Sequence, residues 1–473
     1  MIESYIEKDI MRQIKVVEYL FELKRVVIKE IADFLKVSKV TIKRDIERIL
    51  IIEPNIKVID KSSSIIEVQF WPNATRYELV KKIYAQSNFL HVCSFYLLEE
   101  TNYLKIVEKE HISVAKAFNL RNKVEDFFMA VGIMDVNKKF LDDELKMRLI
   151  FLTVWMRIDL IEEKINKKNI YEAKNIVKQF INEFSNAMNN REMLFFERVI
   201  YLAIERQKMH MNIPDKYKLF VKQGILYHKE KTILEKYKFN ENEIIYISMM
   251  YRLLNQNLST YHYLIIEYEQ IRKAYIDDIS DLIELVHEFE RAFNRDLLKD
   301  IMFEKAFLRF IISSFINQQM FLVEKHYFLS KEQQELCVSI EDVLNEWNKK
   351  KNYGLQLSKR TTEKFCIQVS ELLINDASKR WNVFIVAEDE FSHVAYREWI
   401  ERRLNTDRII IDNTLYYSLN SLPVYIDIET SVILCERSLL NAPDEVIKQS
   451  KTFPISLVSI NDDLRKFFSY VFN

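Results

Sequence analysis

Glycine is the residue whose scarcity most constrains this chain. Only three glycines, Gly132, Gly224 and Gly354, occur in 473 residues. A Walker loop or a GxGxxG turn needs several neighbouring glycines, because the backbone must approach phosphate without a Cβ in the way. These two kinds of nucleotide site are therefore excluded. With only six prolines as well, helices can continue without interruption, and we predict a mainly helical, multidomain protein.

The overall charge gives no sign of a nucleic-acid binder, since the net charge is −1, so any basic face must be local. The four cysteines are far apart in sequence and form no CxxC pair. Their spacing argues against a zinc finger and a disulfide scaffold. We expect no metal and no cofactor. The sequence shows no signal peptide and no apolar run of about 20 residues. We therefore expect a cytoplasmic protein without a membrane segment.

Two amphipathic helices near the N-terminus are joined by a tight turn. The first is expected over residues 27–36 and the second over 39–50, with Ser38 as its cap. We expect the second helix to bury Val40, Ile42, Ile46, Ile49 and Leu50. Such a helix fits the major groove of DNA, which is about 12 Å wide. The side chains expected to contact DNA are Lys39, Thr41, Lys43, Arg44 and Arg48.

The next segment, residues 56–70, alternates apolar and polar side chains around a turn at residues 60–63. This pattern predicts a β-hairpin, or wing, in which Lys57 and Lys61 can contact phosphates. Residues 1–71 are thus predicted to form a winged helix-turn-helix. Basic helix faces are common and usually only solvated, so the alternative is a helix pair without function. The ordered run followed by a wing favours DNA binding.

Residues 72–150 repeat this pattern more weakly and are predicted to form a second winged helix-turn-helix. We expect one helix over 114–120, a second from 124 to 131, and a short hairpin over 133–141. The candidate DNA contacts are Lys116, Arg121, Asn122 and Lys123. Glu125 and Asp126 would repel phosphate, and the expected turn lacks a serine. A packing domain that makes no DNA contact is therefore an equal alternative.

Residues 151–378 have helical periodicity almost throughout, and we divide them into two bundles, 151–268 and 269–378. No HExxH motif occurs, and no two histidines have the i, i+4 spacing of a zinc-binding helix. An exposed, neutral imidazole can instead accept a phosphoryl group. His210 follows a predicted helix in a polar setting and is a candidate. The plain alternative for each histidine is an ordinary surface or core residue.

Residues 379–473 alternate predicted strands and helices, which indicates a small parallel α/β sheet. The strands are expected at 383–387, 408–411, 431–435 and 455–459, and the helices at 392–404 and 462–470. The loop after the first strand holds Glu388 and Asp389, and His393 follows it. A hydrolase would need its two carboxylates in distinct environments. Nothing in the sequence indicates that, so we expect no enzyme.

This order of modules resembles the Mga/AtxA family of global transcription regulators from Gram-positive bacteria. The sharpest matches are VSKVTIKRDI at residues 37–46 and DELKMR at 143–148. The resemblance implies that the bundles are phosphotransferase-system regulation domains (PRDs), phosphorylated on histidine by the carrier HPr. It places the candidate acceptors at His210 and His287. It further implies AT-rich promoter DNA as a partner, recognised largely through its shape and deformability.

The same resemblance makes the tail similar to a phosphotransferase EIIB domain. Such domains carry a reactive cysteine after the first strand, and this chain has none there. A contact within a homodimer or higher oligomer is therefore expected in place of phosphoryl transfer. One alternative to the regulator is an RNA-binding antiterminator with similar bundles. Those proteins begin with a small β domain, whereas this N-terminus is predicted to be helical. The other alternative is a non-catalytic interaction scaffold.

Overall fold

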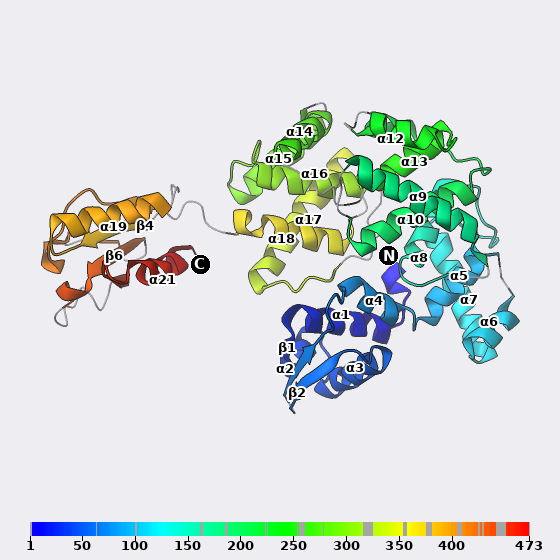
Figure 1. Cartoon of the computed structure of the whole chain (residues 1–473), viewed down its shortest axis with the longest axis horizontal. Helices are drawn as coiled ribbons and strands as arrows, with labels where there is room; N and C mark the ends of the chain where they lie inside the picture. The colour runs from blue at the N-terminus through cyan, green and yellow to red at the C-terminus, as the bar shows by residue number, and fades with distance from the viewer. Residues whose placement is uncertain are drawn as a thin grey trace. The chain divides into compact units, whose positions relative to one another are not determined.

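The computed structural model is mainly helical, with a small parallel sheet near the C-terminus (Figure 1). These features confirm the mainly helical character and the small parallel sheet expected from the sequence. The structure describes residues 2–62, 64–99, 102–160, 164–184, 188–222, 224, 226–252, 254, 261–277, 279–315, 325–352, 357–374, 381–403, 409–423, 426–427, 430–440 and 451–472. Within these residues, no helix combines the length and the apolar character needed to cross a membrane.

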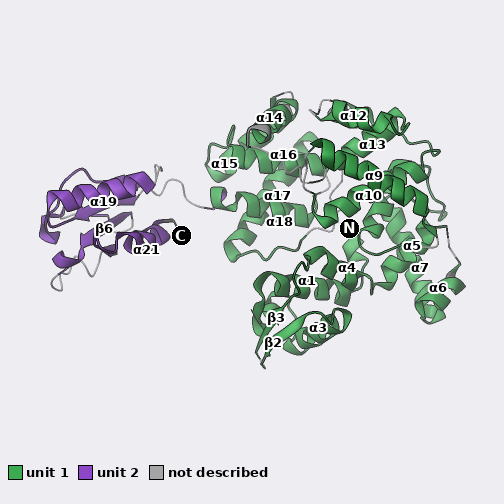
Figure 2. Ribbon diagram, viewed as in Figure 1, with its two compact units in different colours: residues 1–372 green, residues 373–473 purple. Residues whose placement is uncertain are grey.

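Two compact units divide the chain, Met1–Leu372 and Leu373–Asn473 (Figure 2). The boundary expected at residue 378 lies outside the described residues. Two further expected boundaries fall inside continuous helices. The one after residue 150 cuts α8 (Glu144–Trp155), and the one after 268 cuts α14 (Tyr261–Arg272). At both positions the helix therefore continues across the expected domain boundary.

The N-terminal module combines short helices with a three-stranded antiparallel sheet of order β1-β3-β2. Its elements are η1 (Ile2–Ser4), α1 (Lys8–Leu23), β1 (Arg25–Val27), α2 (Ile28–Phe34), α3 (Lys39–Ile52), β2 (Lys57–Lys61), β3 (Ile65–Gln69) and α4 (Arg76–Tyr84). The expected helix pair and hairpin are confirmed. In the hairpin Val58 pairs with Val68, and the register shifts between Val58 and Asp60. Both α3 and α4 pack against α1.

In its described residues, the second segment contains helices and one isolated β-bridge. It contains α5 (Asn88–Leu97), α6 (Tyr103–Glu110), α7 (Val114–Ala130) and α8. The predicted interruption between residues 120 and 124 is wrong, because α7 continues through it. No glycine or proline breaks the helix there, and Arg121 pairs with Glu125 at i, i+4. The expected hairpin is reduced to the bridge between Met134 and Phe140.

The helical bundles follow without strands in the described residues. Their elements are α9 (Lys167–Phe184), α10 (Asn190–Glu205), α11 (Asp215–Lys222), α12 (Tyr227–Glu235), α13 (Glu241–Tyr251), α14, the π-helical η3 (Lys273–Asp277), α15 (Ser280–Phe293), α16 (Ile301–Phe315), α17 (Lys331–Lys351) and α18 (Lys359–Leu373). Aromatic rings fill both bundles. Phe180, Phe196 and Tyr251 meet in the first, and Phe289, Phe307 and Phe365 in the second.

The second unit is a parallel sheet of order β5-β4-β6-β7, as the alternation of strands and helices predicted. It comprises β4 (Trp381–Val386), α19 (Glu390–Arg403), β5 (Ile409–Ile411), η5 (Leu419–Ser421), β6 (Ser431–Glu436), η6 (Arg437–Leu439), β7 (Lys451–Ile455) and α21 (Ile460–Phe472). The strand expected at 455–459 is wrong by four residues. Pro454 lies within β7, which is tolerated because β7 is an edge strand.

Candidate nucleic-acid interface

The turn from α2 to α3 is held by local hydrogen bonds. Lys36 adopts the left-handed conformation (φ 54°), and the Val37 amide donates to the Ala32 carbonyl at 2.9 Å. The Ser38 hydroxyl then accepts the Thr41 amide at 3.1 Å, which confirms the expected cap. One otherwise unsatisfied amide of the helix terminus is thereby paired. These contacts fix the direction in which α3 leaves the turn.

The inner face of α3 combines apolar packing with one buried charge. Ile42, Ile46 and Ile49 are buried, and so is Asp45. The Asp45 carboxylate accepts from the Arg12 guanidinium at 2.5 and 3.1 Å and from Gln13 at 3.3 Å, both on α1. The hydrogen bond to Asp45 raises the pKa of Arg12. Because a buried charge is costly unless it is paired, this contact fixes the orientation of α3 on α1.

The outer face of α3 carries the predicted DNA contacts. Lys39 and Arg44 are exposed, Thr41 and Lys43 are half-buried, and Val40 is 58% exposed. The expected burial of Val40 is therefore wrong. In the described part of the chain, no carboxylate forms an ion pair with Lys39, Lys43 or Arg44. Arg48 differs from them, because its guanidinium pairs with Asp9 at 3.1 Å. Both partners are exposed, and such pairs are weak.

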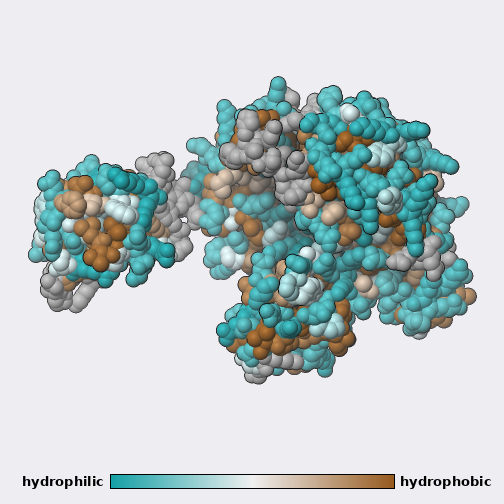
Figure 3. Space-filling view, in the orientation of Figure 1, coloured by the Kyte–Doolittle hydropathy of each residue, from teal (hydrophilic) through white to brown (hydrophobic). Residues whose placement is uncertain are grey.

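The hairpin adds a second basic edge to this module. Lys57 is exposed on β2, as are Val58 and Ile59. The Lys61 backbone belongs to β2, while its side chain lies outside the described residues. Figure 3 shows hydrophobic side chains among the hydrophilic ones on the surface of this module. The module thus presents cations beside exposed apolar groups.

The second helix pair is formed by α6 and α7, which the sequence analysis did not foresee. His111 ends α6 in the left-handed conformation, and Ser113 caps α7 by accepting the Lys116 amide at 3.3 Å. The turn therefore does contain a capping serine, contrary to expectation. The signal was present in the sequence. Ile112-Ser113 followed by Lys116 has the same spacing as Val37-Ser38 followed by Thr41.

The four candidate contacts on α7 are largely engaged with neighbouring side chains. Lys116 Nζ donates to Asn88 Oδ1 at 2.8 Å, and Lys123 Nζ lies 5.8 Å from the centre of the Phe89 ring. Arg121 pairs with Glu125 at 2.8 Å, and Asn122 is half-buried. Lys138 also pairs with Glu125. The Glu125 charge is therefore balanced by two cations, which weakens the repulsion of phosphate expected from it.

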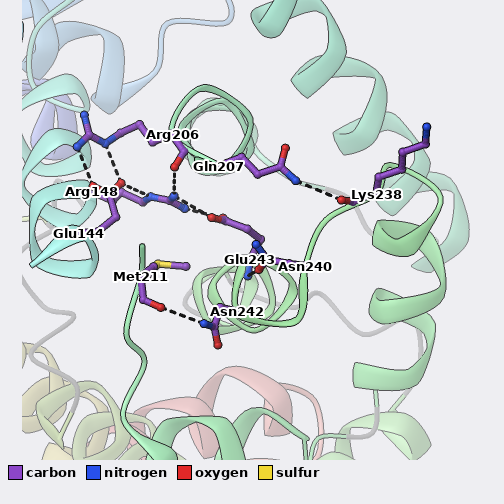
Figure 4. Close-up of polar contacts among 9 residues, drawn as sticks. All are labelled: Glu144, Arg148, Arg206, Gln207, Met211, Lys238, Asn240, Asn242 and Glu243. Atoms are coloured by element: carbon purple, nitrogen blue, oxygen red, sulfur yellow. Dashed lines mark hydrogen bonds and ion pairs between the residues drawn. The ribbon is translucent and has the colours of Figure 1, made fainter. Parts of the chain in front are cut away.

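A buried charge cluster joins α8 to the first bundle (Figure 4). Arg148, fully buried on α8, donates to Glu144 at 2.7 Å, to Glu243 at 2.6 and 2.8 Å, and to the Arg206 carbonyl at 2.9 Å. Arg206 in turn donates to both oxygens of Glu144 at 2.7 Å. Burial lowers the pKa of Arg148, but the hydrogen bonds to Glu243 and Glu144 outweigh it and raise the pKa.

His210 lies four residues beyond Arg206 and is exposed, as the sequence indicated. The neighbouring Met211 carbonyl accepts from the Asn242 side chain at 3.0 Å, as Figure 4 shows. That bond ties the segment after α10 to α13. An imidazole here is accessible to a phosphoryl donor, and it is close in sequence to the Arg206 contact with Glu144. No carboxylate is paired with His210 in the described residues.

His287 is half-exposed on α15 and is oriented by a carboxylate. Its Nδ1 lies 2.6 Å from Glu290 Oε2, while Glu290 Oε1 accepts the Leu297 and Leu298 amides at 2.8 Å. Burial raises the pKa of Glu290, but the hydrogen bonds from His287 and the two amides outweigh it and lower the pKa. An open pocket of about 530 Å³ adjoins them, and its lining includes Arg291 and Arg295.

The three tail residues considered for hydrolysis make separate contacts. Asp389 accepts the Ser392 amide at 2.7 Å, and the Glu388 amide donates to Glu436 at 2.8 Å. His393 is buried, and burial lowers its pKa. Asp389 thus caps the first turn of α19, His393 lies in the core, and the Glu388 side chain is exposed. Among the described residues, no cluster of three His, Cys, Asp or Glu side chains could hold a metal ion.

Comparison with known proteins gives no family and no relative for this chain. No protein-family model matches this chain, and no curated protein matches it in sequence. The capped helix α3, with its outward cations, and the oriented imidazole of His287 are therefore the observations from which a function can be argued.

Proposed function

We propose that this protein is a DNA-binding transcription regulator with a winged helix-turn-helix at its N-terminus, of the kind found in the Mga/AtxA family. The outer face of α3 is the observation that carries the proposal. It places Lys39, Lys43 and Arg44 outward without carboxylate partners in the described residues, while Asp45 anchors the opposite face. Cations held in this way can neutralise phosphates without first breaking an ion pair.

In the proposed complex, α3 enters the major groove by its N-terminal end, where helix amides and side chains approach the base edges. Lys39, Lys43 and Arg44 contact phosphates. The exposed methyl groups of Val40 face the bases, where the thymine methyl is the apolar partner available. Lys57 on the hairpin extends the contact to the adjacent backbone. The pair α6–α7 is a weaker second candidate, because its cations are already engaged.

Histidine phosphorylation by the phosphotransferase carrier is proposed as the regulatory input. Glu290 accepts a hydrogen bond from Nδ1–H of His287, which leaves the electron pair of Nε2 free. That pair attacks the phosphorus of the donor, and the bond between phosphorus and the carrier breaks. Arg291 and Arg295 line the same pocket and offset the added charge of roughly −2. His210 is the second proposed acceptor, on the strength of its exposure.

Dimerisation through the tail completes the proposal. Exposed apolar side chains lie shortly after the carboxyl ends of three parallel strands. They are Phe391 after β4, Leu415 and Tyr417 after β5, and Leu457 and Val458 after β7. The carboxyl ends of parallel strands share one edge of the sheet, so these residues gather there. Exposed apolar side chains gathered at one edge are typical of an interaction site.

Binding to an AT-rich duplex tests the proposal. A variant with Lys39, Lys43 and Arg44 changed to Ala is compared with one in which Lys164, Lys167 and Lys168, all exposed, are changed to Ala. Both variants lose three positive charges. We expect only the first to lose affinity, by at least about tenfold, since each lost phosphate contact removes a counterion-release contribution. Equal loss in both would show that the binding is an effect of net charge alone.

A further inference from the structure

Residues 325–329 form an extended segment, here called the strap, that leads into α17 of the second bundle and contacts the N-terminal module. The next residue, Ser330, caps α17, because its hydroxyl accepts the Gln333 amide at 3.2 Å. The strap's contacts on the module come from residues about 300 positions earlier in the chain, and they involve a buried charge. Neither feature is expected of a simple loop, because loops normally run over the surface.

The centre of the strap is a histidine held by a buried carboxylate. Glu18 of α1 has no exposed side-chain surface. It accepts the His326 amide at 3.2 Å and His326 Nδ1 at 2.5 Å, and it also pairs with Arg76 of α4. Burial raises the pKa of Glu18, but its contacts with His326 and Arg76 outweigh that and lower it. The carboxylate is therefore charged, and the strap is one of its partners.

The other ring nitrogen of His326 faces the second bundle. Arg360 of α18 contacts His326 Nε2, and its guanidinium also pairs with Glu3 at 2.7 Å. Since a guanidinium only donates, Nε2 must accept, and the ring proton is on Nδ1. The imidazole thus bridges Arg360 and Glu18. Removing it would leave the buried Glu18 carboxylate with fewer partners, which is costly in a protein interior.

Side chains on both sides of His326 extend the contact toward α2. The Phe328 ring meets Tyr19 of α1 edge to face at 4.4 Å and lies 5.1 Å from Phe34 of α2. Lys325 pairs with Glu22 of α1. The strap therefore contacts the helix that supports α3 and also the first helix of the candidate DNA-binding pair.

At its other end, the strap continues into a helix bound to α15, which carries His287. Trp347 Nε1 of α17 donates to the Asp281 carbonyl at 3.1 Å, and Lys351 pairs with the Asp281 carboxylate at 2.8 Å. Packed side chains and ion pairs thus connect α15, α17, the strap, α1 and α2. Such a contiguous series of contacts can couple two sites energetically. Measurement of that coupling is the test of such a connection.

We propose that the strap holds the N-terminal module in a fixed orientation on the second bundle and transmits changes in α15 to α2 and α3. A charge change at His287 alters the position of α15 against α17. The strap then changes its hold on α1 and α2, and with it the pose in which α3 meets DNA. The holding role stands on contacts alone, whereas the transmission rests on the proposed function.

Hydrogen exchange of the full chain, followed by mass spectrometry, tests the holding role. Phe328→Ala removes the ring contacts, and Lys325→Glu places like charges together at Glu22 while leaving the core intact. Lys331→Glu, at a position with an 86% exposed side chain, is the matched control. We expect exchange in residues 8–34 to speed up about three- to tenfold in both strap variants, from the loss of one aromatic pair or ion pair. The control and α9–α10 should keep their rates.

Two results would overturn the holding role: unchanged exchange in residues 8–34 in both strap variants, or an equal increase throughout the chain in Lys325→Glu. Transmission is tested by DNA affinity, with His287→Glu made in the unchanged chain and in Lys325→Glu. We expect a shift only where the strap is intact. An equal shift in both, or none in either, overturns transmission. If the unchanged chain binds no DNA, the proposed function fails, and the exchange result still decides the holding role.

Discussion

At the scale of the residue, the proposed contact between Val40 and thymine gives the most specific test of the interface. The methyl groups of Val40 are exposed at the start of α3, between cations. Replacing thymine by uracil removes the methyl group that Val40 would contact and keeps every hydrogen bond. We expect affinity to fall about fourfold, the value of one buried methyl-sized group. Val40→Ser should bind both duplexes equally, whereas Ile51→Ser, at the far end of α3, should still discriminate. Equal binding of both duplexes by the unchanged chain contradicts the contact.

Glu230 on α12 gives a residue-scale test of stability. Burial raises its pKa above the ordinary value of 4.5, against the opposing charge of Arg252. The folded chain therefore holds this proton more tightly than the unfolded chain does. Its contribution to stability falls as pH rises from the unfolded pKa through the folded one. Glu230→Gln should raise the melting temperature at pH 7, with a smaller gain near pH 4.

The control for this prediction is Glu235→Gln, an exposed position at the end of the same helix. It should leave the melting temperature unchanged at both pH values. A lower melting temperature for Glu230→Gln at pH 7 would contradict the account. It would mean that the carboxylate has a stabilising partner in the folded chain.

At the scale of the element, the cap of α3 is the feature on which the interface depends. Ser38→Ala leaves the Thr41 amide without its acceptor, at a cost of about 1 kcal/mol. Exchange of the amides in the first turn of α3 should therefore speed up about fivefold. Ser38→Asn restores a side-chain acceptor and should recover the original rate. Equal rates in the unchanged chain and in Ser38→Ala would show that the cap does not order this turn.

Local patterns explain which elements the sequence could predict. Helix α3 and its cap follow from periodicity and one serine, and both are confirmed. The same periodicity wrongly predicted that Val40 is buried. Periodicity identifies the apolar face of a helix, but it does not show whether another element covers each turn of that face. It also divided α7, since a repeat of the first motif was expected where the chain has no helix breaker. The strand predicted at 455–459 instead spans residues 451–455 and includes Pro454, which an edge strand tolerates.

Contacts between distant parts of the chain could not be predicted from the sequence. The bond between Arg12 and Asp45 joins residues 33 apart, and the bond between Glu18 and His326 joins residues 308 apart. No local spacing predicts either pair, because their partners are set by how whole elements pack. The orientation of His287 by Glu290 is different. Its i, i+3 spacing was visible, and only the exposure and the pocket needed the structure.

At the scale of the whole molecule, the tail should control association. Val458 is 98% exposed in the loop after β7. If this edge pairs with a second copy, Val458→Asp places a charge in an apolar contact, where it is disfavoured. Light scattering after gel filtration should give the mass of a dimer for the unchanged chain and of a monomer for the variant. Val338→Asp, 58% exposed on α17, is the matched control. Equal masses for both variants would exclude this edge.

The salt dependence of DNA binding tests the central claim most directly. Affinity for an AT-rich duplex is measured over a salt series for the unchanged chain and for the chain with Lys39, Lys43 and Arg44 changed to Ala. Each phosphate contact contributes about −0.9 to the slope of log affinity against log salt concentration. The account predicts a steep slope that becomes shallower by about 2 to 3 in the variant. Parallel slopes, or no binding at low salt, would contradict the assignment of α3 as the DNA-binding helix.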